Sequence, residues 1–187
     1  DGAAEELEQL AERGEAHAQL LLGQLYRDGP LLIPDSQRVK DWFTQAAERG
    51  LPEAQYALGK LLLSDDMEVR DPDEGIRWLN QAAKNGNHFA AYRLGKEHLS
   101  GEVVSKDVAR ATARLTQSAE AGNQYAQYML GKLYLTGQGV THDQTQAMDW
   151  FSRSAAQGNQ YAQFFLEHQN DLRPPSVMLA ATRLLYH

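Results

Sequence analysis

The 187-residue chain contains no cysteine, which excludes disulfide bonds and thiolate metal sites. Its apolar runs are short, such as residues 20–22 and 61–63, and fall far below the roughly 20 residues that a membrane-spanning helix needs. Positive charge is also scarce, because 18 lysines and arginines stand against 25 aspartates and glutamates. Binding to a phosphate backbone requires clustered basic residues. We therefore expect no membrane insertion and no direct nucleic acid binding.

Known catalytic and metal-binding signatures are missing as well. The chain has no His-Glu-x-x-His, Ser-x-x-Lys, Walker or G-x-G-x-x-G motif. Acidic residues gather at 71–74, but there they coincide with an expected helix start, where carboxylates stabilise the helix dipole without calcium. The histidines share no ligand spacing; they are His17, His88, His98, His142, His168 and His187. The sequence predicts a protein that is not an enzyme and holds no cofactor or metal.

The opening residues 1–6 are acidic and contain neither a basic start nor an apolar run. We expect either that a targeting segment has been removed or that the chain is a piece of a longer protein. The cellular location is left open, with the cytoplasm slightly favoured because the chain shows no signal segment. Cysteine gives no further guide, since there is none.

What the chain does contain is a repeat of 36 residues. Its landmarks are an alanine at 18, 54, 90, 126 and 162, a Leu-Gly pair at 22, 58, 94 and 130, an aspartate at 35, 71, 107 and 143, and a glycine at 14, 50, 86, 122 and 158. Self-similarity at a fixed period of this length is typical of a stacked solenoid. This pattern takes precedence over any local interpretation.

Each repeat is expected to be a pair of helices. In the clearest copy, Ala126 and Leu130 share the apolar face of the first helix, while Trp150 and Phe151 lie on that of the second. Trp42 and Trp78 lie in register with Trp150, and all three tryptophans are expected in the core. The recurring aspartates stand where the second helix needs an N-cap, and Asn87, Asn123 and Asn159 stand where the first helix does. A mid-helix glycine costs about 1 kcal/mol of helix propensity. Its recurrence indicates that the partner helix approaches closely.

Three departures from the pattern lead to separate predictions. Asp65 replaces the glycine of the other inter-helix turns, so this turn should be deformed. The third repeat has His98 and Arg114 where other repeats carry tyrosine and tryptophan, and we expect it to pack less tightly. The regular pattern stops after Leu166, and the amphipathic segment 176–186 is expected to form a closing helix. The terminal units of a stack have to differ because one side has no neighbour.

The repeat resembles the Sel1-like repeat, a relative of the tetratricopeptide repeat. The matching residues are Ala126, Tyr128, Leu130, Gly131, Tyr134, Gly137, Gly139, Val140, Asp143, Ala147, Trp150, Phe151 and Gly158. The likeness extends from about residue 5 to about residue 167. It implies an all-α fold, an α/α solenoid that winds as a right-handed superhelix. It also implies a bacterial protein with an adaptor role in multiprotein complexes. A weaker likeness joins residues 172–179 to stretches that follow Sel1-like repeats in relaxases of conjugative elements.

These observations predict a single domain over residues 1–187. It would begin with a half-repeat helix at 1–14, continue through full repeats at 15–50, 51–86, 87–122 and 123–158, and end in a divergent cap at 159–187.

The candidate binding surface consists of positions on the first helices that the core pattern leaves over. In tetratricopeptide-like stacks these helices line the concave face. The expected partner-binding residues are Arg27, Tyr56, Lys60, Phe89, Tyr92, Lys96, Tyr125, Tyr128, Lys132, Tyr161 and Phe164, with Leu63, Leu99 and Leu135 on the same face. Aromatic rings would supply contact area, and the lysines would meet carboxylates. Alternatively, Tyr56, Tyr92 and Tyr128 pack between adjacent helices beside solvated lysines, which is the favoured interpretation for those three.

We therefore expect a non-catalytic scaffold that binds a peptide or protein on its concave face. One alternative is a structural module of a larger protein such as a mobile-element relaxase, with homo-oligomers forming through the C-terminal helix. Another is a β-lactamase-like hydrolase as in cysteine-rich Sel1-like proteins, which the absence of cysteine disfavours.

Overall fold

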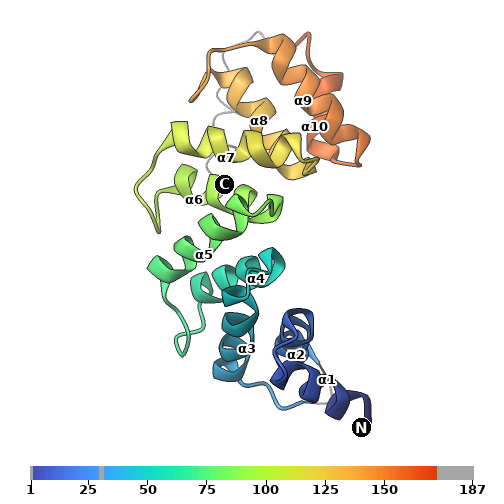
Figure 1. Cartoon of the computed structure of the whole chain (residues 1–187). Coiled ribbons are helices and arrows are strands. Elements are labelled where there is room, and N and C mark those ends of the chain that lie inside the picture. Colours follow the sequence, from blue (N-terminus) through green and yellow to red (C-terminus); the bar gives the residue numbers. More distant parts are fainter. Residues whose placement is uncertain (1, 30–31, 172–187) are drawn as a thin grey trace. The chain divides into compact units, whose positions relative to one another are not determined.

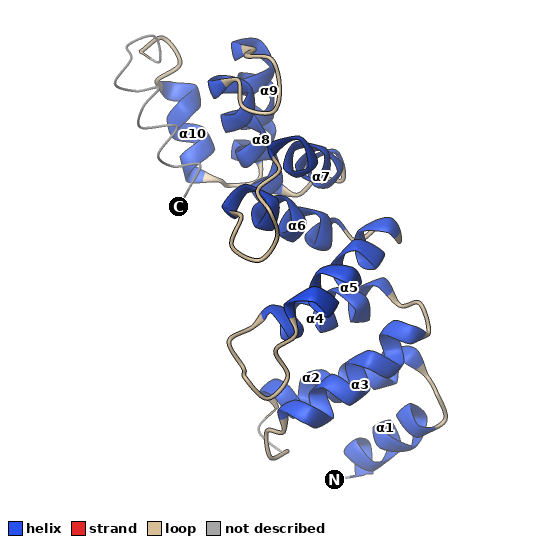
Figure 2. Cartoon of the chain, turned by 90° about the vertical axis from the view of Figure 1, so that its left-hand side faces the viewer, coloured by secondary structure: helices blue, strands red, loops and turns tan. Residues whose placement is uncertain are grey.

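A computed structural model describes residues 2–29 and 32–171. Over these residues the chain is an all-α solenoid of helix pairs without strands, as predicted (Figures 1 and 2). The helices are α1 (Gly2–Glu12), α2 (Ala16–Asp28), α3 (Ser36–Glu48), α4 (Pro52–Leu63), α5 (Pro72–Lys84), α6 (His88–Ser100), α7 (Val108–Glu120), α8 (Gln124–Thr136), α9 (Gln144–Ala156) and α10 (Gln160–Glu167).

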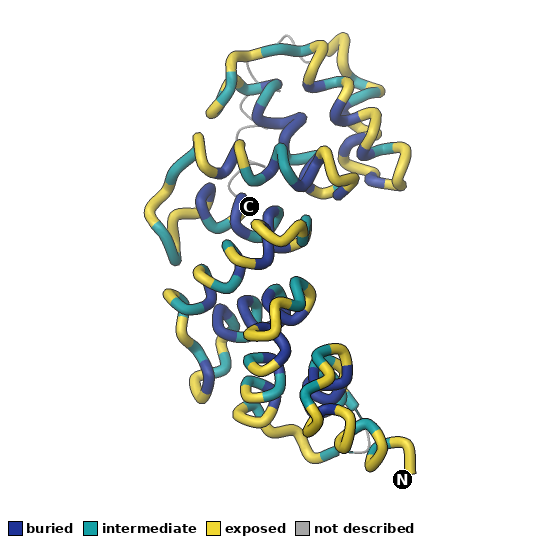
Figure 3. The backbone as a smooth tube through the Cα atoms, viewed as in Figure 1, coloured by how far each residue is buried: buried dark blue, intermediate teal, exposed yellow. Residues whose placement is uncertain are grey.

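The helices form two compact units, residues 1–90 and 91–187, with the boundary inside α6. In the first unit, Leu22, Phe43 and Leu58 belong to one hydrophobic core. In the second, Leu115 and Leu130 anchor one cluster and Phe151 belongs to another. Burial is strongest where paired helices face each other (Figure 3). That the whole chain is a single domain stays a prediction.

Side-chain caps begin the helices where the sequence predicts them. The carboxylates of Asp35, Asp71, Asp107 and Asp143 each accept a hydrogen bond from the backbone N–H three residues later. The side-chain oxygens of Asn87, Asn123 and Asn159 do the same at α6, α8 and α10. Each cap satisfies an amide that has no partner inside the helix. The capping prediction is confirmed at all of these positions.

The mid-helix glycines mark the closest approach within each helix pair. A β-carbon added to Gly131 would lie 2.7 Å from Cε1 of Phe151. The other pairs repeat this geometry with the residue twenty positions later; they are Gly23 with Phe43, Gly59 with Leu79 and Gly95 with Leu115, at 2.6, 2.7 and 2.6 Å. Any larger residue would push the partner side chain away. The predicted close approach is confirmed.

A buried glutamine joins successive repeats. The Nε2 of Gln19 donates to the carbonyl oxygen of Ala11 at 3.0 Å, and Gln55 and Gln127 make the equivalent bond to Ala47 and Ala119 at 3.2 and 3.1 Å. Each bond ties the first turn of one helix to the last turn of the helix before it. The cost of burying a polar amide is offset by this hydrogen bond. In these three repeats it fixes the first helix against the last turn of the preceding helix, whereas the third repeat has Ala91 at this position.

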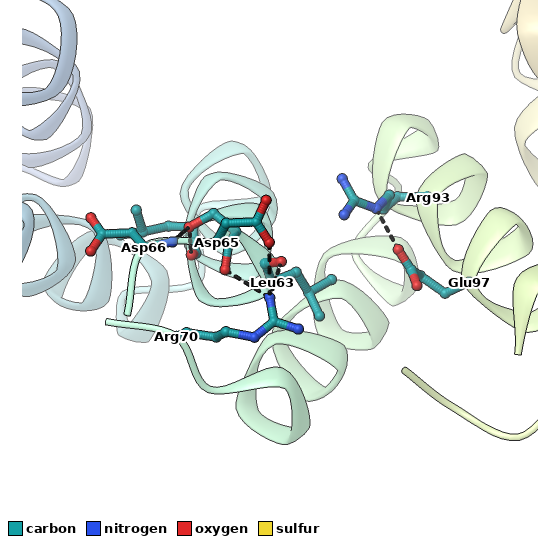
Figure 4. Close-up of polar contacts among 8 residues, drawn as sticks. Leu63, Asp65, Asp66, Arg70, Arg93 and Glu97 are labelled. Atoms are coloured by element: carbon teal, nitrogen blue, oxygen red, sulfur yellow. Dashed lines mark hydrogen bonds and ion pairs between the residues drawn. The ribbon is translucent and has the colours of Figure 1, made fainter. Parts of the chain in front are cut away.

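The turn after α4 is built differently from the glycine turns, as predicted. Gly101 and Gly137 turn the chain with φ of 71° and 70°, whereas no other residue type in the described ranges adopts positive φ. Instead, Nη1 of Arg70 donates to the carbonyl oxygens of Leu63 and Ser64, both at 2.8 Å (Figure 4). A basic side chain thus satisfies the last carbonyls of α4 in place of a left-handed glycine.

Two core predictions need correction. Trp150 is buried, but Trp42 and Trp78 are only partly buried and cover the first core from its edge. The third repeat was expected to pack loosely, yet Leu94 and Leu115 are fully buried at its helix contact. The histidine that replaces the tyrosine has a local effect. His98 is buried, and its Nδ1 is left without a hydrogen-bond partner. The leucines thus keep the helix contact of the third repeat closed although the tyrosine and the tryptophan are replaced.

The C-terminal end follows the predicted loss of regularity. Helix α10 ends at Glu167, one residue after the pattern stops. The expected closing helix at 176–186 lies outside the described residues. Among the helices of the described part, none combines the length and the apolar character that crossing a bilayer takes.

The glycine contact predicts that a Gly→Ala substitution in this helix lowers stability, opposite to its usual effect. Gly→Ala in a helix interior normally stabilises by about 1 kcal/mol, but Gly131→Ala should destabilise by about 1–3 kcal/mol because the methyl group overlaps the Phe151 ring. Urea unfolding followed by circular dichroism measures the change. As a control, Ala113→Gly at an exposed position of α7 should show the ordinary cost of glycine. An unfolding midpoint of Gly131→Ala at or above that of the wild type would contradict the prediction.

Candidate functional site

Three repeats carry the same group of one tyrosine, one lysine and one further aromatic residue, here called the Tyr–Lys–aromatic cluster. The tyrosine and the lysine lie one turn apart on the first helix of a repeat, and the second aromatic residue begins the first helix of the next repeat. The clusters are Tyr56, Lys60 and Phe89; Tyr92, Lys96 and Tyr125; and Tyr128, Lys132 and Tyr161. The sequence predicts these residues on one surface, and the structure shows how they pair.

The three clusters have nearly the same geometry. The ring centroids of the two aromatic residues are 5.9, 6.0 and 5.9 Å apart, with interplanar angles of 33°, 36° and 34°. The lysine Nζ lies 4.5, 5.5 and 4.4 Å from the centroid of its tyrosine ring. Tilted aromatic pairs and cation–π contacts are each favourable by about 0.5–1 kcal/mol or more. Each tyrosine is therefore held between an ammonium group and a second ring.

Exposure separates the two aromatic positions. Tyr56, Tyr92 and Tyr128 are half-buried, as the packing interpretation expects. Phe89, Tyr125 and Tyr161 are 49%, 54% and 70% exposed. The inner ring of each cluster thus supports the outer one, which lies open to solvent. The half-buried tyrosines thus agree with the packing interpretation, and partner binding by the exposed rings stays a prediction.

In the second unit, two clusters line one groove of about 670 Å³. The lining residues are Tyr92, Lys96, Leu99, Ser100, Gln124, Tyr125, Tyr128, Met129, Lys132, Gly158, Asn159, Gln160 and Tyr161. They come from α6, from α8, and from the turn before α10 together with the start of that helix. The charged side chains of this lining are two lysines, and it contains no carboxylate.

Lys132 differs from its counterparts and from the solvated lysine that the packing interpretation expects. It is 4% exposed, whereas Lys60 is partly exposed and Lys96 is exposed. Burial lowers the pKa of Lys132 from 10.5 to about 8, because the charged amine loses hydration. Burial, followed by the nearby Tyr161, raises the pKa of Tyr128 to about 12. At neutral pH the groove therefore presents a largely protonated amine beside a neutral phenol.

Other predicted residues lie apart from these clusters. Arg27 forms an ion pair with Asp28 at 2.7 Å, and its repeat has Leu20 and Gln24 in place of the tyrosine and the lysine. Phe164 is exposed and stacks on His168, with ring centroids 4.2 Å apart. Leu63, Leu99 and Leu135 were expected on the binding face, but all three are buried. Only Leu99 also reaches the groove, as part of its lining.

Several groove residues were missed by the sequence reasoning. They are Ser100, Gln124, Met129, Gly158, Asn159 and Gln160. Asn159 was recognised as a helix cap, which is its bonding role here. The signal that could have placed Gly158, Asn159 and Gln160 is the position of Tyr161. Side chains of a helix lean toward its N-terminus, so Tyr161 covers the surface at the start of α10.

A family model for the Sel1 repeat matches residues 16–51, 52–87, 88–123 and 124–159. The chain belongs to the Sel1 repeat family. Members of this family are generally protein-interaction scaffolds, and their solenoid fold is typically non-catalytic. The weaker likeness to relaxase-associated repeats has no support, and its residues, 172–179, lie outside the described ones.

Solved structures agree with the Sel1 repeat assignment. A Sel1 repeat protein from Oxalobacter formigenes is 30% identical with a TM-score of 0.82, over 90% of this chain and 49% of that one. A protective antigen of uropathogenic Escherichia coli with an SLR fold is 32% identical with a TM-score of 0.84, over 97% of this chain and 40% of that one. An immunity protein from Pseudomonas aeruginosa shares the fold at 23% identity and a TM-score of 0.56, over 97% and 72%.

This Sel1 repeat chain thus spans about half the length or less of its two more similar structural relatives. No curated protein resembles it closely enough to count as a match.

The lowered pKa of Lys132 predicts how its burial affects stability. Between about pH 8 and 10.5 the unfolded chain keeps a proton that the folded chain releases, so raising the pH stabilises the fold at this group. Replacing Lys132 with methionine removes that dependence. The stability of Lys132→Met relative to wild type should thus be higher near pH 7 than near pH 10, by on the order of 1–2 kcal/mol.

Urea unfolding of both proteins at the two pH values measures this difference, in which the other titrating groups largely cancel. Lys96→Met, which removes an exposed lysine at the equivalent position, controls for the loss of one positive charge. If the difference in unfolding free energy between Lys132→Met and wild type is the same at both pH values, burial does not lower the pKa of Lys132.

Proposed function

We propose that this protein is a non-catalytic scaffold that binds an extended segment of another protein in the groove of its second unit. The observation that carries the proposal is the gathering of four tyrosines, Tyr92, Tyr125, Tyr128 and Tyr161, along one groove. Tyrosine is enriched among the residues that dominate binding energy at protein interfaces. Its ring supplies contact area, and its hydroxyl supplies a hydrogen bond.

The clusters also restrict the movement of these rings. Tyr125 contacts Tyr92, and Tyr161 contacts Tyr128, at centroid separations of 6.0 and 5.9 Å. A side chain that is already held in place loses less conformational entropy when a partner binds. This explains why exposed rings at these positions are useful for binding, although an isolated exposed tyrosine on a surface needs no explanation.

The size and chemistry of the groove favour binding of a peptide segment over catalysis. A volume of about 670 Å³ is suited to a few side chains of an extended peptide. The groups of the lining that titrate are lysines and tyrosines. Acid–base catalysis near neutral pH most often uses histidine or a carboxylate. This composition supports recognition as the role of the groove.

Peptide display on the whole protein tests the proposal. A random peptide library selected on the wild type should yield sequences that do not bind the double variant Tyr125→Ser/Tyr161→Ser, because both exposed rings are lost. Circular dichroism should show unchanged helicity, since neither ring is buried.

The matched control is Phe89→Ser. Phe89 occupies the same repeat position in the first unit and is similarly exposed, but it does not line the groove. Selected peptides should bind Phe89→Ser as they bind the wild type. Enrichment that is equal on all three proteins, or no enrichment at all, would refute the groove as the binding site.

A further inference from the structure

We infer that the segment bound in this groove is acidic, and that it places aspartate or glutamate side chains against Lys96 and Lys132. This inference rests on the proposed function and specifies the chemistry of the partner. Nothing in the repeat pattern requires a partner of this charge, because the pattern fixes the core and the caps.

The first argument is the contrast in charge between the whole chain and the groove. The whole chain carries a formal charge of −7, yet the lining of the groove contains two lysines and no aspartate or glutamate. The positive groove thus lies in a protein that is acidic overall. Complementary charge at an interface selects the partner and excludes partners of the same sign. An acidic segment would be attracted to this groove and repelled elsewhere.

The nearest acid in the sequence is already paired. Glu97 follows Lys96, but its Oε1 lies 2.8 Å from Nε of Arg93, one turn earlier on α6 (Figure 4). The side chain of Glu97 is mostly buried in this pair, and the residue is not part of the groove lining. An arginine therefore neutralises Glu97 away from the groove. The charge that α6 contributes to the groove is that of Lys96.

The second argument is the burial of Lys132. Its residue is 4% exposed and its Nζ lies 4.4 Å from the Tyr128 ring centroid, at the groove wall. An amine with little water around it interacts more strongly with a nearby carboxylate than an exposed amine does, because the local dielectric constant is lower. The same interaction is also less screened by salt. Lys132 is thus expected to contribute more to binding than Lys96.

The rest of the lining suits an acidic segment that also carries apolar residues. Gln124, Gln160 and Ser100 can donate hydrogen bonds to carboxylates, while Leu99 and Met129 offer apolar contact. A single-stranded nucleic acid is also anionic and stacks on aromatic rings. It is the less favoured ligand, because two lysines are few for a phosphate backbone and the chain as a whole is acidic.

A pair of synthetic peptides tests the inference with the whole protein. The acidic probe has three copies of Gly-Glu-Leu-Asp, fluorescein at its N-terminus and an amide at its C-terminus. Its neutral twin has glutamine and asparagine in place of the acids. Fluorescence anisotropy should show the acidic probe binding at least about tenfold more tightly than the twin, a difference of about 1.4 kcal/mol.

Three lysine variants locate the effect. Lys132→Met should weaken binding of the acidic probe about tenfold, since the methionine keeps the aliphatic packing and removes the charge. Lys132→Arg keeps a positive charge and should keep most of the affinity, which guards against a loss caused by misfolding. Lys60→Met, in the cluster of the first unit and outside the groove lining, should leave the affinity unchanged.

Each other outcome contradicts the inference in a distinct way. Equal binding of the twin, or no effect of Lys132→Met, shows that the acids do not contact this lysine. If a probe with a free C-terminal carboxylate alone binds, the ligand group is a chain terminus. If oligothymidylate binds more tightly than the acidic probe, the ligand is a nucleic acid. Where display-selected peptides still depend on Tyr125 and Tyr161, these results leave the proposed function standing and remove only the charge requirement.

Discussion

The contact between a mid-helix glycine and the side chain twenty residues later determines most of this structure. It brings the two helices of each repeat together and fixes the rotation of the first helix about its own axis. In α8 the five residues 128–132 read Tyr-Met-Leu-Gly-Lys, and α4 and α6 have the same Tyr-x-Leu-Gly-Lys order. The leucine enters the core and the glycine meets the partner helix. The tyrosine and the lysine are then carried to the helix face that builds the cluster.

The buried glutamine provides the second constraint, between repeats. Gln127 bonds to the last turn of α7, and Gln157, the residue that follows α9, donates to the Gln127 Oε1 at 2.9 Å. These bonds tie α8, which carries Tyr125 and Tyr128, to α7 and to the end of α9. The helix that presents both rings is thus held in part by a glutamine that is buried inside the stack.

The sequence predicted the helices, their caps, the close glycine contacts and the aromatic and lysine positions, because each follows from a period or a local preference. It could not predict the pairing of rings across repeats or the groove, since periodicity fixes which residues correspond and leaves the arrangement of successive repeats open. The unequal burial of Lys96 and Lys132 shows this limit most clearly. Their repeat positions are identical, but Tyr128, which lies beneath Lys132, also contacts the rings of Phe151 and Phe165. The repeat equivalent of Phe151 is Leu115, a smaller residue.

If the groove binds an acidic segment as proposed, the burial of Lys132 couples folding to that binding. A protonated amine that has lost its water destabilises the folded state, and the lowered pKa of Lys132 expresses that cost. An anion that binds beside the amine would compensate for the lost water. Part of the desolvation cost of folding would therefore be offset when the anion binds. Ligands that bind only the folded state raise its stability in proportion to their affinity. An exposed lysine such as Lys96 keeps its water and has no such cost to recover. In the proposed complex, two residues at one repeat position would therefore have different roles. Lys96 would attract the acidic partner from solution, and Lys132 would hold it once water has left the groove.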